Sequence, residues 1–300
     1  MGKIAFVFAG QGAQSVGMGR DLYDRFDSVK EIFSLSEPIW ELCRNGPKEL
    51  LDVTINTQPA LFLTGLACAE ALAANNVSAR GAAGFSLGEV TAVCCSGLMD
   101  RRQAFDFVCH RAKAMHECSE KQKGSMFAVL KLPDARVEEL CASLPQAYPV
   151  NYNSPGQTVV ACAESTADEL QKAVAASGGR AMKLAVSGAF HSPFMDAAGA
   201  SIAEYLEKQT LGDMKIPVYA NRTARIYDDP KDLLANQVNH PVLWQSTIEN
   251  MISDGFDTFI ELGPGKTLTG LIKKINPEVR AYNVSDMESL EKTIEGIQNA

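Results

Sequence analysis

Short apolar runs alternate with longer segments of helical spacing along most of the chain. Four runs are short, mostly apolar and close to turn-forming residues, at 3–10, 79–85, 216–221 and 256–265. Such runs are typical of strands buried in a parallel sheet. Segments with helical spacing lie between them, so the pattern predicts an α/β fold with a mostly parallel sheet covered by helices on both faces.

The N-terminal third contains two predicted helices. One follows the glycine-rich segment GQGAQSVGMG and covers the region 18–35. The other covers 57–76, where Thr57 is a plausible N-cap. Pro59 would then fall in the first turn, where a helix does not need an amide hydrogen.

The helix predicted over 97–117 carries a basic residue on its apolar face. Asp100 and Gln103 resemble a capping box at its start. The apolar side chains that follow recur at helical spacing, and Arg111 falls on the same face. Arginine is rarely buried without an anion. Arg111 therefore either pairs with an acidic residue of this chain or clamps the carboxylate of a ligand.

The segment 125–187 has a different pattern from the rest of the chain. Its pattern predicts the order strand, helix, strand, strand, helix, strand, and the two middle strands flank the turn sequence NSPG. This βαββαβ order is that of a ferredoxin-like unit. We therefore predict a large subdomain made of 1–124 and 188–300, with a small ferredoxin-like subdomain, 125–187, inserted in it.

Composition narrows the function classes. The 300 residues are 46% hydrophobic and 21% charged, with a net charge of −8, which argues against a nucleic-acid partner. The eight cysteines form no CxxC pair, so neither a zinc site nor a disulfide framework is expected. The apolar N-terminal run is too short for a signal peptide, and no run reaches transmembrane length. We predict a cytoplasmic protein with no membrane partner.

The sequence GFSLG places glycines two residues before and after Ser86. In an α/β-hydrolase-like fold, this spacing lets a strand turn sharply into a helix. The turn lifts the serine Oγ off the sheet and aims the next N–H at a developing oxyanion. A predicted strand precedes Ser86 and a helix follows it, so Ser86 is a candidate nucleophile. The alternative is a small serine packed at a crowded turn.

A serine nucleophile needs a base, and the chain has four histidines. His191 lies where the small subdomain returns to the large one, and domain junctions are favoured places for a site. His110 and His116 lie off the apolar face of their helix, so we expect them to be solvated. His240 precedes a proline, which favours a loop or capping role. His191 is the candidate base, and a structural histidine is the alternative.

The loop GQGAQ at 10–14 follows the first predicted strand. It does not fit the dinucleotide fingerprint GxGxxG, because Ser15 stands where the third glycine would be. A glycine loop in this place can still present backbone N–H groups to an anion. The alternative is a plain tight turn.

Several motifs together resemble one family. The chain contains, in this order, FVFAGQGAQ, TQPAL, GFSLGE, HRAKAM, NYNSPGQ, VSGAFHSPFM, NQVNHPVLW and ELGPGKTLTGL. This set is similar to the malonyl-CoA:acyl carrier protein transacylases of bacterial fatty acid synthesis. The acyltransferase domains of polyketide synthases share that fold. The match covers almost the whole chain and is far more specific than any single motif.

The resemblance implies roles for the catalytic groups. Ser86 matches the nucleophile and His191 its base. Gln11 and Leu87 match the residues whose backbone N–H groups form the oxyanion hole. Gln237 matches the residue whose backbone carbonyl orients the histidine, in place of the usual Asp.

The resemblance also implies residues that bind the substrate. Arg111 matches the arginine that holds the free carboxylate of malonate. Phe190, next to the base, would crowd a methyl group on the α-carbon, which favours malonyl over methylmalonyl. Asn153 and Asn221 match asparagines near the site. Phe85 is a departure, because the family usually has histidine before the nucleophile.

The implied reaction is malonyl transfer in two halves, by ping-pong kinetics, from malonyl-CoA to the phosphopantetheine thiol of an acyl carrier protein. No cofactor and no metal are expected, and the family is usually monomeric. The carrier protein of this family is acidic, so a local basic patch on this acidic chain would have to dock it. The candidates for this patch are Lys266, Lys273, Lys274, Arg180 and Lys183. The alternative for each of them is a solvated charged face.

Three other readings remain. The chain could be a stand-alone acyltransferase of a polyketide pathway. It could be an α/β-hydrolase such as a thioesterase or carboxylesterase, although no Asp is convincingly placed before His191 and Arg111 would be unexplained. It could be a non-catalytic acyl-CoA-binding or scaffold protein, but loss of Ser86, His191 or Arg111 would be expected then, and all three are present.

Overall fold

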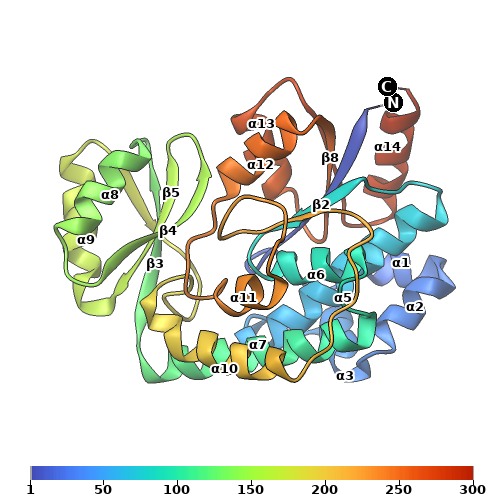
Figure 1. The fold of residues 1–300 in the computed structure, drawn as a ribbon, viewed down its shortest axis with the longest axis horizontal. Helices are drawn as coiled ribbons and strands as arrows, with labels where there is room; N and C mark the ends of the chain where they lie inside the picture. The colour runs from blue at the N-terminus through green and yellow to red at the C-terminus, as the bar shows by residue number, and fades with distance from the viewer. Residues whose placement is uncertain (1, 300) are drawn as a thin grey trace.

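The computed structural model describes residues 2–299, which form two parts, each built on its own sheet (Figure 1). The larger part has a five-stranded sheet in the order β7-β2-β1-β8-β9, and all neighbouring strands are parallel. The mostly parallel sheet is confirmed. Its strands are β1 (Lys3–Phe8), β2 (Gly81–Gly84), β7 (Val218–Tyr219), β8 (Phe256–Leu262) and β9 (Arg280–Val284).

Helices cover both faces of this sheet because side chains along each strand alternate in direction. Phe6 and Phe8 of β1 belong to the large hydrophobic cluster on one face, while Ala5 and Val7 belong to a second cluster on the other. The helices of this part are α1 (Arg20–Arg25), α2 (Asp27–Phe33), α3 (Glu37–Asn45), α4 (Lys48–Leu51), α5 (Thr54–Ala74), α6 (Leu87–Ser96), α7 (Arg101–Lys121), α10 (Asp196–Glu207), α11 (Pro230–Ala235), α12 (Trp244–Ser253), α13 (Thr267–Ile275) and α14 (Met287–Gln298).

The smaller part has an antiparallel sheet in the order β4-β5-β3-β6. This is the strand order of a ferredoxin-like unit, and two helices pack on the sheet at the left of Figure 1. The predicted limits of the subdomain, 125–187, stay a prediction. Its elements are β3 (Gly124–Leu130), α8 (Asp134–Ala142), β4 (Ala147–Ser154), β5 (Gln157–Ala163), α9 (Ala167–Ala176) and β6 (Arg180–Lys183).

Backbone hydrogen bonds join the two parts at one point. Val242, just before α12, donates its N–H to the Val150 carbonyl at 2.8 Å and accepts one from Tyr152 at 3.0 Å. The next residue, Leu243, donates to the Asn221 carbonyl at 2.8 Å. These bonds connect the edge strand β4 to the segment 242–243, which also contacts Asn221 of the functional site described below.

Two helix predictions need correction. The helix expected over 18–35 is broken at Phe26, whose extended backbone ends α1 and precedes α2. Thr57 is not an N-cap, because α5 begins at Thr54 and the Thr57 hydroxyl donates to carbonyls of the preceding turn. Pro59 consequently lies inside α5. The sequence patterns also did not predict α3, α4, β9 or α14.

The start of α7 follows the prediction in part. The Asp100 side chain accepts a hydrogen bond from the Gln103 backbone N–H at 2.8 Å, so it caps the helix. The Gln103 side chain does not complete the box, because its amide donates to the Thr210 carbonyl at 3.0 Å. Between residues 2 and 299, no helix is long and apolar enough to cross a membrane.

Candidate active site

Ser86 occupies a strained turn between β2 and α6. Its backbone has φ 53° and ψ −105°, a conformation that typically costs about 1–3 kcal/mol in a residue other than glycine. A Cβ on Gly84 would lie 1.9 Å from the Gly88 carbonyl carbon. The glycines of GFSLG are therefore required for the strand to pack against the first turn of the helix.

Two buried amide side chains hold this turn. Asn221 accepts a hydrogen bond from the Ser86 N–H at 2.8 Å and donates to the Gly84 carbonyl at 2.6 Å. Gln237 donates from Nε2 to the Ser86 carbonyl at 2.7 Å. Both side chains are almost completely buried. They fix the strained backbone and so the direction of the Ser86 Oγ.

His191 lies directly against the serine. Its Nε2 is 2.7 Å from the Ser86 Oγ, and its Nδ1 is 3.0 Å from the backbone carbonyl of Gln237. A carbonyl only accepts, so Nδ1 carries the proton and the Nε2 lone pair faces the serine hydroxyl. Burial, and then the positive charge of Arg111, lower the pKa of His191 to about 4. The imidazole is therefore neutral at pH 7.

Arg111 is buried in the same cluster, with 1% of its surface exposed. Its Nη1 donates to Gln58 Oε1 and its Nη2 to Gln237 Oε1, each at 2.6 Å, and Nη2 is also 3.3 Å from the Ser86 Oγ. Its Nε has no acceptor among the residues that the structure describes. Within residues 2–299, no carboxylate lies within 4.0 Å of it, so it does not form the buried ion pair considered above.

The guanidinium of Arg111 remains charged although burial lowers its pKa to about 10. Its contacts are neutral amide oxygens, which compensate a buried cation only in part. A carboxylate entering beside Ser86 would supply the missing charge.

Ser86 and His191 open into a cavity of about 270 Å³ to which both parts of the protein contribute. Its walls are mainly apolar, with a few polar groups, as in sites for small molecules. Residues of the larger part that line it include Gln11, Phe85, Phe190, Met115 and Leu271, and those of the smaller part include Met126, Asn151, Asn153 and Val159.

Backbone N–H groups are available beside the serine. Neither the Gln11 N–H nor the Leu87 N–H donates to a protein acceptor anywhere in residues 2–299. Leu87 is the first residue of α6, and the first N–H groups of a helix have no intrahelical partner. These are the two amides to which the family resemblance gives the role of an oxyanion hole.

The remaining predicted residues also lie at this cavity. Phe190 precedes His191 and is 5% exposed. Asn153 lies on β4, and its buried Oδ1 has no hydrogen-bond partner within the described chain. The ring of Phe85 forms part of the wall and packs edge-on against Trp244, with ring centroids 5.6 Å apart.

The other histidines lie outside the cavity. His110 is half-buried, stacks on Tyr205 with ring centroids 4.5 Å apart and bonds to Ser201 of α10, and His116 is also only partly exposed. The prediction that both are solvated was wrong, because other helices pack beside α7. The Nδ1 of His240 donates to the Asn236 carbonyl at 2.8 Å, which confirms its capping role.

Sequence reasoning missed three polar residues in this cluster. Gln58 holds Arg111 although it lies in a long apolar helix. Glu89 of α6 is fully buried and bonds to Tyr227 and Gln237. A polar residue inside an otherwise apolar helix was the available signal for Gln58 and Glu89, whereas nothing near Tyr227 in the sequence marks it.

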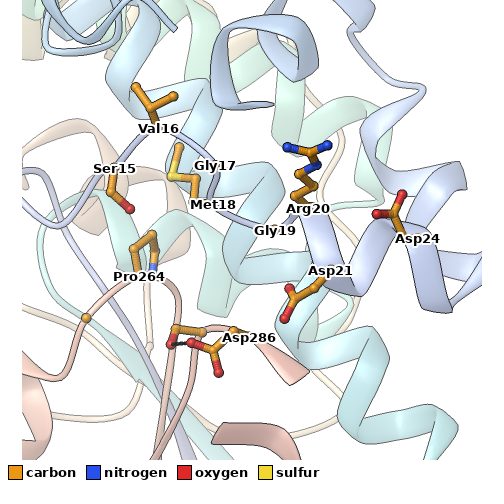
Figure 2. A pocket seen from close by; sticks show the side chains of 12 residues that line it. Ser15, Val16, Gly17, Met18, Gly19, Arg20, Asp21, Asp24, Pro264 and Asp286 are labelled. Atoms are coloured by element: carbon orange, nitrogen blue, oxygen red, sulfur yellow. Dashed lines mark hydrogen bonds between the residues drawn. The ribbon is translucent and has the colours of Figure 1, made fainter. Parts of the chain in front are cut away.

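A larger cavity, of about 610 Å³, lies between α1 and the turn before α14 (Figure 2). Two of the three aspartates that line it, Asp21 and Asp286, are engaged in the fold. Asp21 accepts a hydrogen bond from the Met287 N–H at 2.6 Å, and Asp286 caps α14. Ser86 and His191 do not line it.

The donor groups give no sign of a metal centre. Within residues 2–299, no three His, Cys, Asp or Glu side chains are grouped so that they could hold a metal ion. The eight cysteines are free thiols.

Comparison with known proteins agrees with this geometry. The sequence profile of the acyl transferase domain matches residues 5–297. The chain belongs to the acyl transferase family. This acyl transferase is 34% identical to the malonyl CoA-acyl carrier protein transacylase of Bacillus subtilis, over 99% of the chain and 98% of that protein.

Solved structures extend the comparison. The acyl transferase is similar to the malonyl CoA-acyl carrier protein transacylase of Clostridium perfringens, with a TM-score of 0.95, 38% identity and coverage of 99% of this chain and 98% of the other. It is also similar to a malonyl-transacylase in complex with a type II polyketide synthase acyl-carrier protein, with a TM-score of 0.94, 34% identity and coverage of 98% and 99%.

Proposed function

We propose that this acyl transferase moves a malonyl group from malonyl-CoA to the phosphopantetheine thiol of an acyl carrier protein, through a malonyl ester on Ser86. Such transfer is the activity named for its relatives. The observation that carries the proposal is the buried Arg111 beside the serine, which lacks an anionic contact within residues 2–299. A malonyl group has both the thioester that Ser86 attacks and the carboxylate that Arg111 lacks.

In the first half-reaction, Ser86 attacks the thioester carbonyl. His191 Nε2 accepts the hydroxyl proton as the new C–O bond forms, because the neutral imidazole already faces that proton. The Gln237 carbonyl accepts from Nδ1–H and stabilises the imidazolium that results. His191 then gives the proton to the sulfur of coenzyme A as the C–S bond breaks.

The tetrahedral intermediate carries a negative oxygen. The free N–H groups of Gln11 and Leu87 are the donors that we assign to it, and one such donor is typically worth about 3–4 kcal/mol in the transition state. In the second half-reaction, the phosphopantetheine thiol attacks the malonyl ester. His191 takes the thiol proton and returns it to the Ser86 oxygen, so the kinetics should be ping-pong.

Arg111 and Phe190 select the acyl group. A carboxylate that forms two hydrogen bonds with Arg111 replaces weaker contacts, while acetyl would leave the guanidinium with neutral direct contacts only. Phe190 lies on the cavity wall next to the base, where it would crowd a methyl group on the α-carbon. The amide of Asn153 is available to the pantetheine arm, since its Oδ1 is unpaired within residues 2–299.

The carrier protein requires a docking surface. Of the five basic candidates, Lys183 pairs with Glu164 at 2.9 Å, and Lys273 donates to the Pro277 and Val279 carbonyls. Lys266, at the start of α13, is exposed and is the candidate closest in sequence to the cavity-lining Thr267. We propose no resident cofactor and no metal, and the monomeric state and cytoplasmic location stay predictions.

Fatty acid synthesis is the proposed pathway, because it is the role of the family that the motifs resemble. A polyketide pathway is the second candidate, and it rests on the similarity to a transacylase bound to a polyketide synthase carrier protein. Rates of discharge to a fatty acid carrier protein and to a polyketide carrier protein distinguish the two.

Intact mass spectrometry after brief mixing with malonyl-CoA tests the central proposal. We expect a malonyl adduct that persists, that an added carrier protein discharges, and that is missing in Ser86→Ala. Release of free coenzyme A and malonate without an adduct would instead indicate a thioesterase. Failure to react with malonyl-CoA at all would overturn the proposal.

A further inference from the structure

Glu89 is a buried carboxylate three residues after the proposed nucleophile. It accepts hydrogen bonds from the Tyr227 hydroxyl, from Gln237 Nε2 at 2.7 Å and from the Asn221 N–H at 3.2 Å. Within residues 2–299, no Lys, Arg or His nitrogen lies within 4.0 Å of it. A buried carboxylate without a direct cation is costly, so its retention here calls for a reason.

The partners of Glu89 are the same groups that hold the reacting side chains. Gln237 is the centre of this arrangement. Its Nε2 donates to Glu89 and to the Ser86 carbonyl, its Oε1 accepts from Arg111, and its backbone carbonyl accepts from His191.

The Gln237 amide therefore lies between a buried anion and a buried cation. The carboxylate of Glu89 requires an N–H toward it, and the guanidinium of Arg111 requires a carbonyl oxygen toward it. The two charges together fix the orientation of the amide, and the amide connects them as an indirect ion pair.

We propose that Glu89 is a positioning residue and the internal counter-ion of Arg111, and that its charge sets how strongly the cavity prefers acyl groups with a free carboxylate. This inference rests on the proposed malonyl transfer. When the cavity is empty or holds acetyl, Glu89 compensates the guanidinium through Gln237. When malonyl is bound, Arg111 faces two anions, and the ionised Glu89 opposes the second one.

The preference should therefore depend on the ionisation of Glu89. Burial raises the pKa of Glu89 to about 7, while bonds from Tyr227 and Gln237, the Asn221 N–H and the charge of Arg111 act in the opposite direction. Arg111 on α7 and Tyr227 after β7 are the titratable groups that face it. Below pH 7 a neutral Glu89 does not repel malonyl, and above pH 7 its charge does. The preference for malonyl over acetyl should fall as pH rises.

The test is a competition between malonyl-CoA and acetyl-CoA from pH 5.5 to 8.5, read as the ratio of the two adducts on Ser86 by intact mass spectrometry. This ratio of kcat/KM values cancels any loss of active enzyme and the titration of His191, since both substrates need the same groups. We expect the wild-type ratio to fall about fivefold across the range, on the order expected for one unit charge acting on another inside a protein.

Two variants of the cluster sharpen the test. Glu89→Gln keeps the shape but removes the charge, so its ratio should stay high and independent of pH. Tyr227→Phe removes one hydrogen bond that lowers the pKa of Glu89, so its inflection should move to higher pH. Tyr227→Phe retains the Glu89 carboxylate, so the proposal can still be tested with this variant if Glu89→Gln does not fold.

Tyr219→Phe is the matched control. Tyr219 is also a buried tyrosine whose hydroxyl bonds to a carboxylate, but this carboxylate belongs to Asp254 and not to Glu89. The ratio of malonyl to acetyl adducts in Tyr219→Phe should vary with pH as it does in the wild type. A wild-type ratio that does not change with pH, and that Glu89→Gln also leaves unchanged, would overturn the role of Glu89 while malonyl transfer stands. Absence of any malonyl adduct in the wild type would overturn the proposed function and this inference with it.

Discussion

The cavity beside Ser86 is smaller than the pocket of Figure 2, but its polar groups have more unmet requirements for charge and hydrogen bonds. The first is about 270 Å³ and the second about 610 Å³. Arg111, whose Nη2 lies 3.3 Å from the Ser86 Oγ at the first, is buried and bonds only to neutral groups, whereas Arg20, which lines the second, is exposed to water. Asp21 and Asp286 of the larger pocket already stabilise the fold through Met287 and α14. Unmet hydrogen-bonding and charge requirements, and not volume, identify the functional cavity.

Loss of the base should give the largest effect at the smaller cavity. We expect His191→Ala to lower kcat/KM for malonyl-CoA by about 10⁴-fold, since the serine then keeps its proton. Steady-state transfer to a carrier protein measures it. His110→Ala, on a histidine that stacks on Tyr205 away from the cavity, is the control. A loss below tenfold in His191→Ala would show that another group acts as the base.

Substitution of Arg111 should have the next largest effect. The comparison of the two cavities depends on this arginine, which has no anionic contact within residues 2–299. Arg111→Ala should lower kcat/KM for malonyl-CoA by about 100- to 1,000-fold, as expected for removal of one partner of a buried charge pair. The value for acetyl-CoA should change much less. Equal losses with the two substrates would mean that Arg111 supports the fold and does not recognise the carboxylate.

Phe190 should affect a finer choice between substrates. Phe190→Ala should raise the ratio of methylmalonyl to malonyl transfer by about tenfold, because one methyl group in a tight pocket is worth about 1–3 kcal/mol. Competition between the two CoA esters measures the ratio. An unchanged ratio would place the methyl group against another wall of the cavity.

The pH dependence of the first half-reaction follows from His191. The base is active when neutral, and burial beside Arg111 lowers its pKa to about 4 from the usual 6.5. On the acid side of its pH profile, we expect kcat/KM to show no histidine inflection near 6.5 and to decline only as pH falls through about 4. The same shift lowers stability as pH falls from 6.5 to 4, because the unfolded chain takes up the proton first. Circular dichroism at each pH separates the two effects, and a decline centred at 6.5 would contradict the proposed environment.

A substitution at the larger pocket should change the stability of the protein and leave its activity almost unchanged. Asp286→Ala removes the N-cap of α14 and should lower the free energy of unfolding by about 1 kcal/mol. The value of kcat/KM should stay within a factor of two. Denaturant unfolding and the transfer assay measure the two quantities, and a large loss of activity would mean that this pocket contributes to the reaction.

Much of the fold could be predicted because the sequence patterns that indicate it are local. The short apolar runs, the βαββαβ order and the glycine spacing around Ser86 each depend on residues close in sequence, and the structure contains all three. The errors also had local causes. Phe26 interrupts a helical pattern without a glycine or proline, and Thr57 resembles a cap although α5 begins one turn earlier. The half-buried His110 shows that helix periodicity alone does not reveal which neighbouring helix covers a face.

The sequence by itself determined four strands of the parallel sheet, the βαββαβ order of the small subdomain, the tight turn at Ser86, and the presence of one arginine on an apolar helical face. Only the tertiary structure decided how these groups meet. Gln237 bonds to Ser86 across 151 positions and to Glu89 across 148, and no local spacing encodes such distances. The charge states of His191, Arg111 and Glu89 depend on burial and on each other, and burial exists only once the sheet, its helices and the small subdomain have packed together.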